Sequence, residues 1–147
     1  MNRLIVLLLA LLATACSTPE RLSMSVNMSG YGIETYKDQN IPGRYRAACA
    51  YDASAHVSVE ELRWKTMLDG IKTAKQDGYD LVTWGGPTPV KLTTKSGYRG
   101  GPMTTVKESP GFIYSIQGFK SSDPNHNVKA RPPDELITEI NRQLVKP

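Results

Sequence analysis

Four residue types are scarce in this 147-residue chain, which has only two cysteines, two histidines, two tryptophans and two phenylalanines. Two cysteines cannot build a disulfide-dense scaffold. Apolar residues make up 39% and charged residues 22% of the chain, which excludes coiled-coil and collagen-like compositions. The length suits one domain with a real core, and the 12 glycines and 10 prolines predict long loops around it.

The motifs of common enzyme classes are also missing from the sequence. His56 and His126 are far apart and outside any H-E-x-x-H pattern, so they do not provide the three or four ligands of a zinc site. The chain has no G-x-S-x-G elbow, no Walker loop and no G-x-G-x-x-G motif after a strand. We therefore expect two exposed loop histidines, no metal, no cofactor and no catalysis.

Only one long apolar run occurs, and it lies at the N-terminus. Arg3 is followed by ten residues without a polar side chain, from Leu4 to Ala13. One basic residue before such a run is the layout of a signal peptide, and the run is shorter than the roughly 20 residues of a membrane-spanning helix. We predict that residues 1–15 are a signal peptide, in preference to a buried N-terminal helix.

The end of this run, Ala13-Thr14-Ala15-Cys16, resembles the lipobox of bacterial lipoproteins. The resemblance implies cleavage after Ala15, a diacylglyceryl group on the Cys16 thiol and an acyl chain on the new amine. Two or more chains give stable membrane anchoring, whereas one gives marginal binding. The usual motif has leucine where this chain has Ala13. An ordinary secretory signal, cleaved at the same small residues, is the alternative.

The residue after the cysteine bears on localisation. In Gram-negative lipoproteins an aspartate at that position favours the inner membrane, so Ser17 implies the outer membrane, facing the periplasm. In a Gram-positive source the anchor would lie in the plasma membrane. The predicted organisation is a lipidated N-terminus and short tether over 16–21, followed by a single periplasmic domain over 22–147.

The patterning of the remaining chain predicts an α+β fold. A mostly antiparallel sheet is expected, with one long helix packed on a face and a short C-terminal helix. Ser58 and Glu61 form a capping box at the start of the long helix, Gly78 suits its end, and Gly70 is explained by close packing on the sheet. The predicted strands cover 21–29, 33–39, 44–52, 79–84, 89–95, 103–107 and 112–119, and the predicted helices cover 59–77 and 134–145.

Cys49 is the one cysteine left after lipidation. It alternates with Tyr45, Ala47 and Tyr51 along one face of a predicted strand, with Arg44 and Arg46 on the other face. Because free cysteine is among the most buried residue types, we interpret Cys49 as a core thiol. A disulfide-linked dimer and a catalytic nucleophile are the alternatives.

Acidic residues are the other candidates for a catalytic site, and the sequence supports them only weakly. Glu60 and Glu61 are explained by helix capping, and Asp77 and Asp80 by solvation at a helix end and a strand start. A glycosidase would need two carboxyl groups about 5–9.5 Å apart, one with a raised pKa. A pocket holding Asp77, Asp80 or His56 with strongly shifted pKa would favour a periplasmic hydrolase, which is an alternative function.

Positive charge is concentrated in one part of the sequence. The net charge is +4, and residues 85–131 contain seven basic and two acidic residues. A predicted hairpin there carries the possible interaction patch, which consists of Lys91, Lys95, Tyr98, Arg99 and Lys107. Its expected partners are anionic lipid, peptidoglycan or an acidic envelope protein, but not nucleic acid.

A second, weaker resemblance covers residues 30–84. The layout of Gly30-Tyr31, a strand, a helix and then Gly78-Tyr79-Asp80 is similar to that of uncharacterised small proteobacterial lipoproteins. No catalytic residue comes with this resemblance. Together these observations predict a membrane-anchored cell-envelope lipoprotein that acts as a non-catalytic binding or structural module, with a hydrolase or a thiol-linked dimeric envelope component as alternatives.

Overall fold

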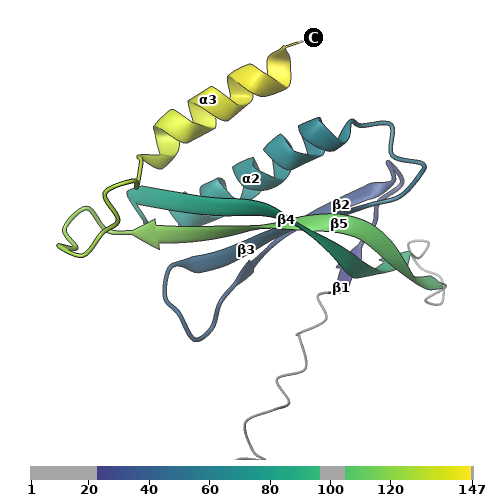
Figure 1. The fold of residues 1–147 in the computed structure, drawn as a ribbon, viewed down its shortest axis with the longest axis horizontal. Coiled ribbons are helices and arrows are strands. Elements are labelled where there is room, and N and C mark those ends of the chain that lie inside the picture. The colour runs from purple at the N-terminus through teal and green to yellow at the C-terminus, as the bar shows by residue number, and fades with distance from the viewer. Residues whose placement is uncertain (1–22, 97–104, 147) are drawn as a thin grey trace, which may run out of the picture.

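The computed structural model describes residues 23–96 and 105–146, which form one five-stranded sheet and two helices (Figure 1). The strand order is β1-β4-β5-β3-β2. Only the β1–β4 pair is parallel, so the sheet is mixed but mostly antiparallel and the α+β prediction is confirmed. The elements are β1 (Ser23–Ser25), β2 (Tyr31–Lys37), β3 (Arg44–Tyr51), α2 (Val59–Gln76), β4 (Leu81–Ser96), β5 (Thr105–Phe119) and α3 (Pro133–Val145).

The long helix α2 begins and ends where its sequence signals predict. The Ser58 hydroxyl accepts a hydrogen bond from the backbone N–H of Glu61 at 3.1 Å, which satisfies one of the free donors of the first turn. Past the other end, Gly78 adopts a φ of +85°, a region that disfavours other residues. The 18-residue helix therefore spans the predicted range closely.

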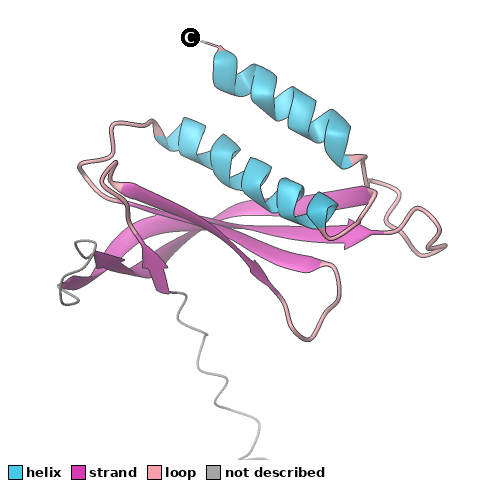
Figure 2. Ribbon diagram, turned by 180° about the vertical axis from the view of Figure 1, so that it is seen from behind, coloured by secondary structure: helices cyan, strands magenta, loops and turns pink. Residues whose placement is uncertain are grey.

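One face of the sheet packs against α2 and forms the main core. Tyr45, Ala47 and Cys49 of β3 are buried there, as their alternation predicts. They meet Leu62 and Ile71 of α2 in the same cluster. Figure 2 shows both helices on this side of the sheet, with α3 stacked beyond α2 and contributing Leu136 and Ile140 to the cluster.

Two predicted strand breaks are wrong. β4 continues through Gly85-Gly86-Pro87, and β5 continues through Ser109-Pro110-Gly111. A register shift between Gly85 and Thr88 accommodates the residues without a ladder partner. The two strands stay paired from Leu81–Phe119 to Ser96–Thr105, so the hydrogen-bonding partner overrides the local turn signals.

Within the described residues, the predicted first strand ends early. β1 covers Ser23–Ser25, residues 21–22 lie outside the described range, and the chain turns at Met28, whose side chain is fully exposed. Met24 is buried in a second cluster with Ala48, Ala50 and Leu92. Because Ala48 and Ala50 alternate with the core residues of β3, this second cluster lies on the sheet face away from α2.

Candidate functional site

The part of the sheet face opposite α2 that the second cluster leaves open carries Arg44 and Arg46. Both residues belong to β3 and both are exposed. Their neighbours Tyr45 and Ala47 are buried on the opposite face of the strand, which packs against α2. Strand pairing places Arg46 beside Ser115 and Arg44 beside Gln117 of β5. The alternation of one strand thus presents two guanidinium groups on one surface, which no described element covers.

A hollow of about 470 Å³ lies next to the two arginines. Gly85 of β4 lies across from Ser115, and a Cβ added to it would meet no atom within 4 Å. A side chain at this position would therefore project into open space. The lining consists of Arg44, Arg46, Thr83, Trp84, Gly85, Ser115, Ile116, Gln117, Phe119 and Asn127.

A second hollow of about 640 Å³ borders Arg46 from the other side. It is lined by residues 35–40 of β2 and the following turn, together with Arg46. Arg46 therefore lies between two concavities on the side of the sheet opposite α2. We call the surface formed by Arg44, Arg46, Thr83, Gly85, Ser115 and Gln117 the open face.

The charges of the open face are not neutralised locally. Within the described ranges, no carboxylate lies within 4.0 Å of the Arg44 or Arg46 guanidinium. Two acidic residues of β2 and the turn after it have other partners: Glu34 accepts a hydrogen bond from the Tyr36 hydroxyl at 2.7 Å, and Asp38 accepts from the backbone N–H of Asn40 at 2.9 Å. Burial and Glu34 together raise the pKa of Tyr36, so its hydroxyl stays protonated.

This arrangement is suited to holding an anion. A guanidinium presents a planar fork of N–H donors that matches carboxylate or phosphate oxygens, and it stays charged at all physiological pH values. The Ser115 hydroxyl adds a neutral donor between the arginines and Gly85. The open face thus combines two fixed positive charges, polar neighbours and room for a ligand.

The predicted basic patch is only partly within the described residues. Lys91 and Lys107 are exposed on β4 and β5, and Lys107 is paired with Asp52 at 3.2 Å. The Asp52 pKa is lowered, first by hydrogen bonds from Ser54 and then by Lys107. Lys95 pairs with Val106 through the backbone. Tyr98 and Arg99 lie outside the described residues, as does the predicted lipidation site Cys16.

Asp77 and Asp80 are held separately by their own partners. Asp77 contacts Lys37 at 2.8 Å and the Tyr45 hydroxyl at 2.6 Å, and these hydrogen bonds lower its pKa. Asp80 accepts hydrogen bonds from Ser121, which lower its pKa as well. Both carboxylates therefore remain ionised at neutral pH, whereas a general acid needs a raised pKa.

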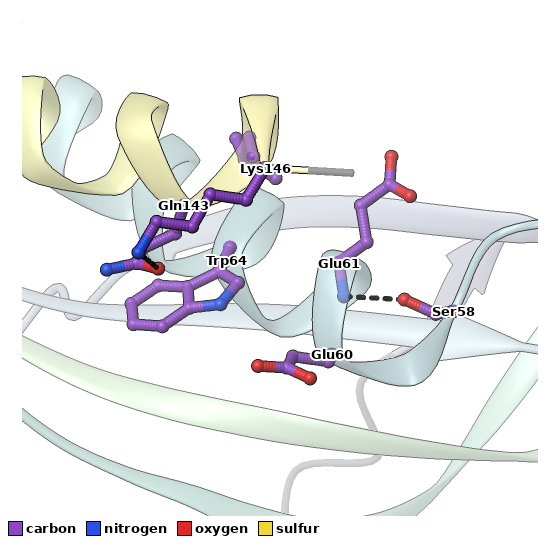
Figure 3. A pocket seen from close by; sticks show the side chains of 7 residues that line it. Ser58, Glu60, Glu61, Trp64, Gln143 and Lys146 are labelled. Carbon is purple, nitrogen blue, oxygen red and sulfur yellow. Dashed lines mark hydrogen bonds between the residues drawn. The ribbon is translucent and has the colours of Figure 1, made fainter.

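A small hollow of about 260 Å³ lies between the start of α2 and the end of α3 (Figure 3). Glu60 and Trp64 line it from α2, and Gln143 and Lys146 close it from the other side. Glu61, which also borders it, is paired with Lys65 at 2.8 Å. Of the predicted capping box, the structure shows the Ser58 half, in which the Ser58 hydroxyl accepts from the Glu61 N–H, whereas the Glu61 carboxylate contacts Lys65.

Cys49 is completely buried, as the alternation of β3 predicts. Its thiol donates to the backbone oxygen of Ala50 at 3.8 Å. Burial raises the Cys49 pKa from 9.0 to about 11, although a hydrogen bond with Thr66 opposes the shift. A thiol that is both buried and protonated is a poor nucleophile.

Two further findings concern the described part of the chain. No cluster of three or more histidine, cysteine, aspartate or glutamate residues there could hold a metal ion. No helix within the same ranges is both long and apolar enough to cross a membrane. Both histidines lie in loops, but only His56 is exposed as the sequence predicts, whereas His126 is half-buried with its ring nitrogen 2.6 Å from the Asp123 backbone oxygen.

The open face was not predicted as a site from the sequence. The alternation of Arg44 and Arg46 places them on the outer face of a strand, but it does not show that no other element covers that face. The sequence predicts that a strand ends at Gly85, whereas in the structure Gly85 lies inside β4 and lines a hollow. In comparisons with known proteins, no family model, no curated protein and no solved structure matches this chain.

Proposed function

We propose that this protein is a lipid-anchored component of the bacterial cell envelope whose folded domain binds a partner without catalysis. The anchor is the lipidated Cys16, and in a Gram-negative source it lies in the outer membrane and faces the periplasm. The observation that carries this proposal is the sequence Ala13-Thr14-Ala15-Cys16 after an apolar run of signal-peptide length.

The position of β1 supports a short tether. The described domain begins at Ser23, seven residues after Cys16. Seven extended residues span at most about 25 Å, so a lipid on Cys16 would hold the domain close to the bilayer. The parallel pairing of β1 with β4 at Thr93, Thr94 and Lys95 places the end of the tether beside the basic β4–β5 hairpin.

The surface chemistry supports binding rather than catalysis. Asp77 and Asp80 have lowered pKa values and structural partners, and Cys49 is inaccessible. By contrast, Arg44 and Arg46 are exposed with no carboxylate partner in the described residues. Fixed charge without a titrating acid–base pair is typical of a recognition surface.

Processing of the precursor tests the anchor. Globomycin, which blocks lipoprotein signal peptidase, should make a heavier precursor accumulate, and Cys16→Ala should prevent incorporation of labelled fatty acid. The mature wild-type protein should fractionate with membranes. Normal cleavage in the presence of globomycin, with no label on the wild-type protein, would contradict the proposal and favour an ordinary secretory signal.

A further inference from the structure

We propose that the open face docks onto the phosphate groups of anionic phospholipids in the same membrane that holds the anchor. This inference rests on the proposed anchoring through Cys16, because the anchor brings the face to the bilayer. It assigns a partner to Arg44 and Arg46, which lie away from the basic hairpin that the sequence singles out.

The charge of the open face is complementary to a phosphate layer. Arg44 and Arg46 are two residues apart on one strand, so their Cα atoms are about 7 Å apart and their side chains leave the same surface. Neither has a carboxylate partner within 4.0 Å in the described ranges. Guanidinium groups form bidentate, charge-assisted hydrogen bonds with phosphate oxygens.

The origin of the tether determines which side of the domain meets the membrane. Met24 of β1 packs with Ala48 and Ala50, which lie on the same face of β3 as Arg44 and Arg46. The described chain therefore begins on the side of the sheet away from the helices, as Figure 1 shows. With at most about 25 Å between Cys16 and β1, the anchor favours orientations in which this side faces the lipid.

Two hollows in the open face provide space for phospholipid headgroups. The hollow beside Gly85 and the hollow beyond Arg46 measure about 470 and 640 Å³. Both are within the size range of small-molecule sites. Ser115 lies between Arg46 and Gly85 in the strand order and can donate a further hydrogen bond to a phosphate oxygen. Glu34 and Asp38 also lie toward this side, and their charges weaken the attraction without pairing with the arginines.

Vesicle binding by the unlipidated mature chain tests the inference separately from the anchor. Since every described element and both core clusters lie within residues 23–146, a chain of residues 16–147 with Cys16→Ser retains the whole fold. It should cosediment with vesicles of phosphatidylglycerol and phosphatidylethanolamine much more than with phosphatidylcholine vesicles. Raising the salt concentration should weaken the binding, because ions screen exposed charges.

The variants identify the surface involved. The double variant Arg44→Ala with Arg46→Ala should weaken partition into anionic vesicles about 30-fold. Each basic residue near the surface contributes about 1 kcal/mol of binding free energy, and about 1.4 kcal/mol corresponds to a tenfold change in the partition coefficient. The charge-matched control is Lys72→Ala with Arg142→Ala, two exposed residues on the helices, and it should bind like the parent chain. Arg44→Lys with Arg46→Lys retains both charges and should retain most of the binding, which separates loss of charge from misfolding.

Specific results would overturn the inference. Equal loss in the arginine pair and the helix-side control would show that only net charge matters. Equal binding to anionic and neutral vesicles, or arginine-dependent sedimentation with purified peptidoglycan in place of vesicles, would also overturn it. These results do not depend on lipidation, so failure of the globomycin test and failure of the docking test remain distinguishable.

Discussion

Gly70 lies where α2 comes closest to the sheet. A Cβ at this position would lie 2.2 Å from Ile116 Cδ1 and 2.9 Å from Ala47 Cβ, and both neighbours are buried in the main core. Glycine lowers helix stability by about 1 kcal/mol relative to alanine, so propensity alone disfavours it. The explanation from the sequence, close packing on the sheet, is confirmed by these distances.

Gly70→Ala should therefore destabilise the protein despite improving the helix propensity. Overpacking costs about 1–3 kcal/mol and should exceed the gain of about 1 kcal/mol, for a net loss of about 1 kcal/mol in the free energy of unfolding. Urea denaturation measures the effect. Gly85→Ala is the matched control and should change stability by less than about 0.5 kcal/mol, since nothing lies near its Cβ. A more stable Gly70→Ala variant would contradict this account of the packing.

Cys49 couples stability to alkaline pH. Burial raises its pKa from 9.0 to about 11 in the folded protein, so the folded state retains the thiol proton longer than the unfolded state does. The resulting stabilisation is fully present below pH 9 and is lost as the pH rises toward 11. Tyr36, Tyr45 and Tyr114 also have raised pKa values and act in the same direction.

A comparison of the parent chain with Cys49→Ala isolates the thiol contribution. The difference in unfolding free energy between the two proteins should shrink between pH 9 and pH 11, by up to about 2–3 kcal/mol for a shift of two pKa units. Denaturation curves measured at several pH values give this difference. A constant difference across the range would show that the thiol does not titrate differently on folding.

At the scale of elements, the ends of α2 depend on local chemistry, whereas the lengths of β4 and β5 do not. Ser58 and the Glu61 N–H that it caps are three residues apart, so this N-cap can be recognised without the fold. Gly86-Pro87 and Pro110-Gly111 are strong turn signals, yet both lie inside strands. Their neighbours are paired across the long antiparallel ladder between the two consecutive strands of the hairpin, which continues past both turn signals.

Ser58→Ala should weaken the start of α2. Loss of the side-chain acceptor leaves the Glu61 N–H without its cap and should lower the free energy of unfolding by about 1 kcal/mol. Thermal denaturation followed by circular dichroism measures the change. Ser58→Asp keeps an acceptor next to the positive end of the helix dipole and should stay close to the parent. Equal melting of the alanine and aspartate variants would show that this cap contributes nothing.

The arrangement of the whole molecule depends on which elements cover each of the two faces of the sheet. α2 covers one face completely enough to bury the main core, whereas the second cluster covers only part of the other face. Met24 is the most N-terminal residue in that cluster and holds the three-residue strand β1 in place. The position of β1 in turn determines where the tether leaves the domain.

Met24→Ala should release β1 from the sheet. The cavity and the lost contacts should cost about 2 kcal/mol or more, and amide hydrogen exchange should accelerate at Ser23–Ser25 and at their partners in β4. Met28→Ala is a matched control, because Met28 is fully exposed and its truncation should leave both quantities unchanged. Unaltered exchange at β1 in Met24→Ala would mean that backbone pairing alone holds the strand.

Patterns that are local in sequence were sufficient for the bounds of α2 and the buried face of β3, and they are also the basis of the anchor at Cys16, which stays a prediction. Each of these depends on residues within a few positions of one another: a capping box, an alternation of period two, and small residues before a cysteine. Tertiary structure alone decided the continuity of β4 and β5, the parallel partner of β1, and the exposure of Arg44 and Arg46. These features depend on hydrogen-bond ladders and on coverage of a face by elements distant in sequence, which no local pattern encodes.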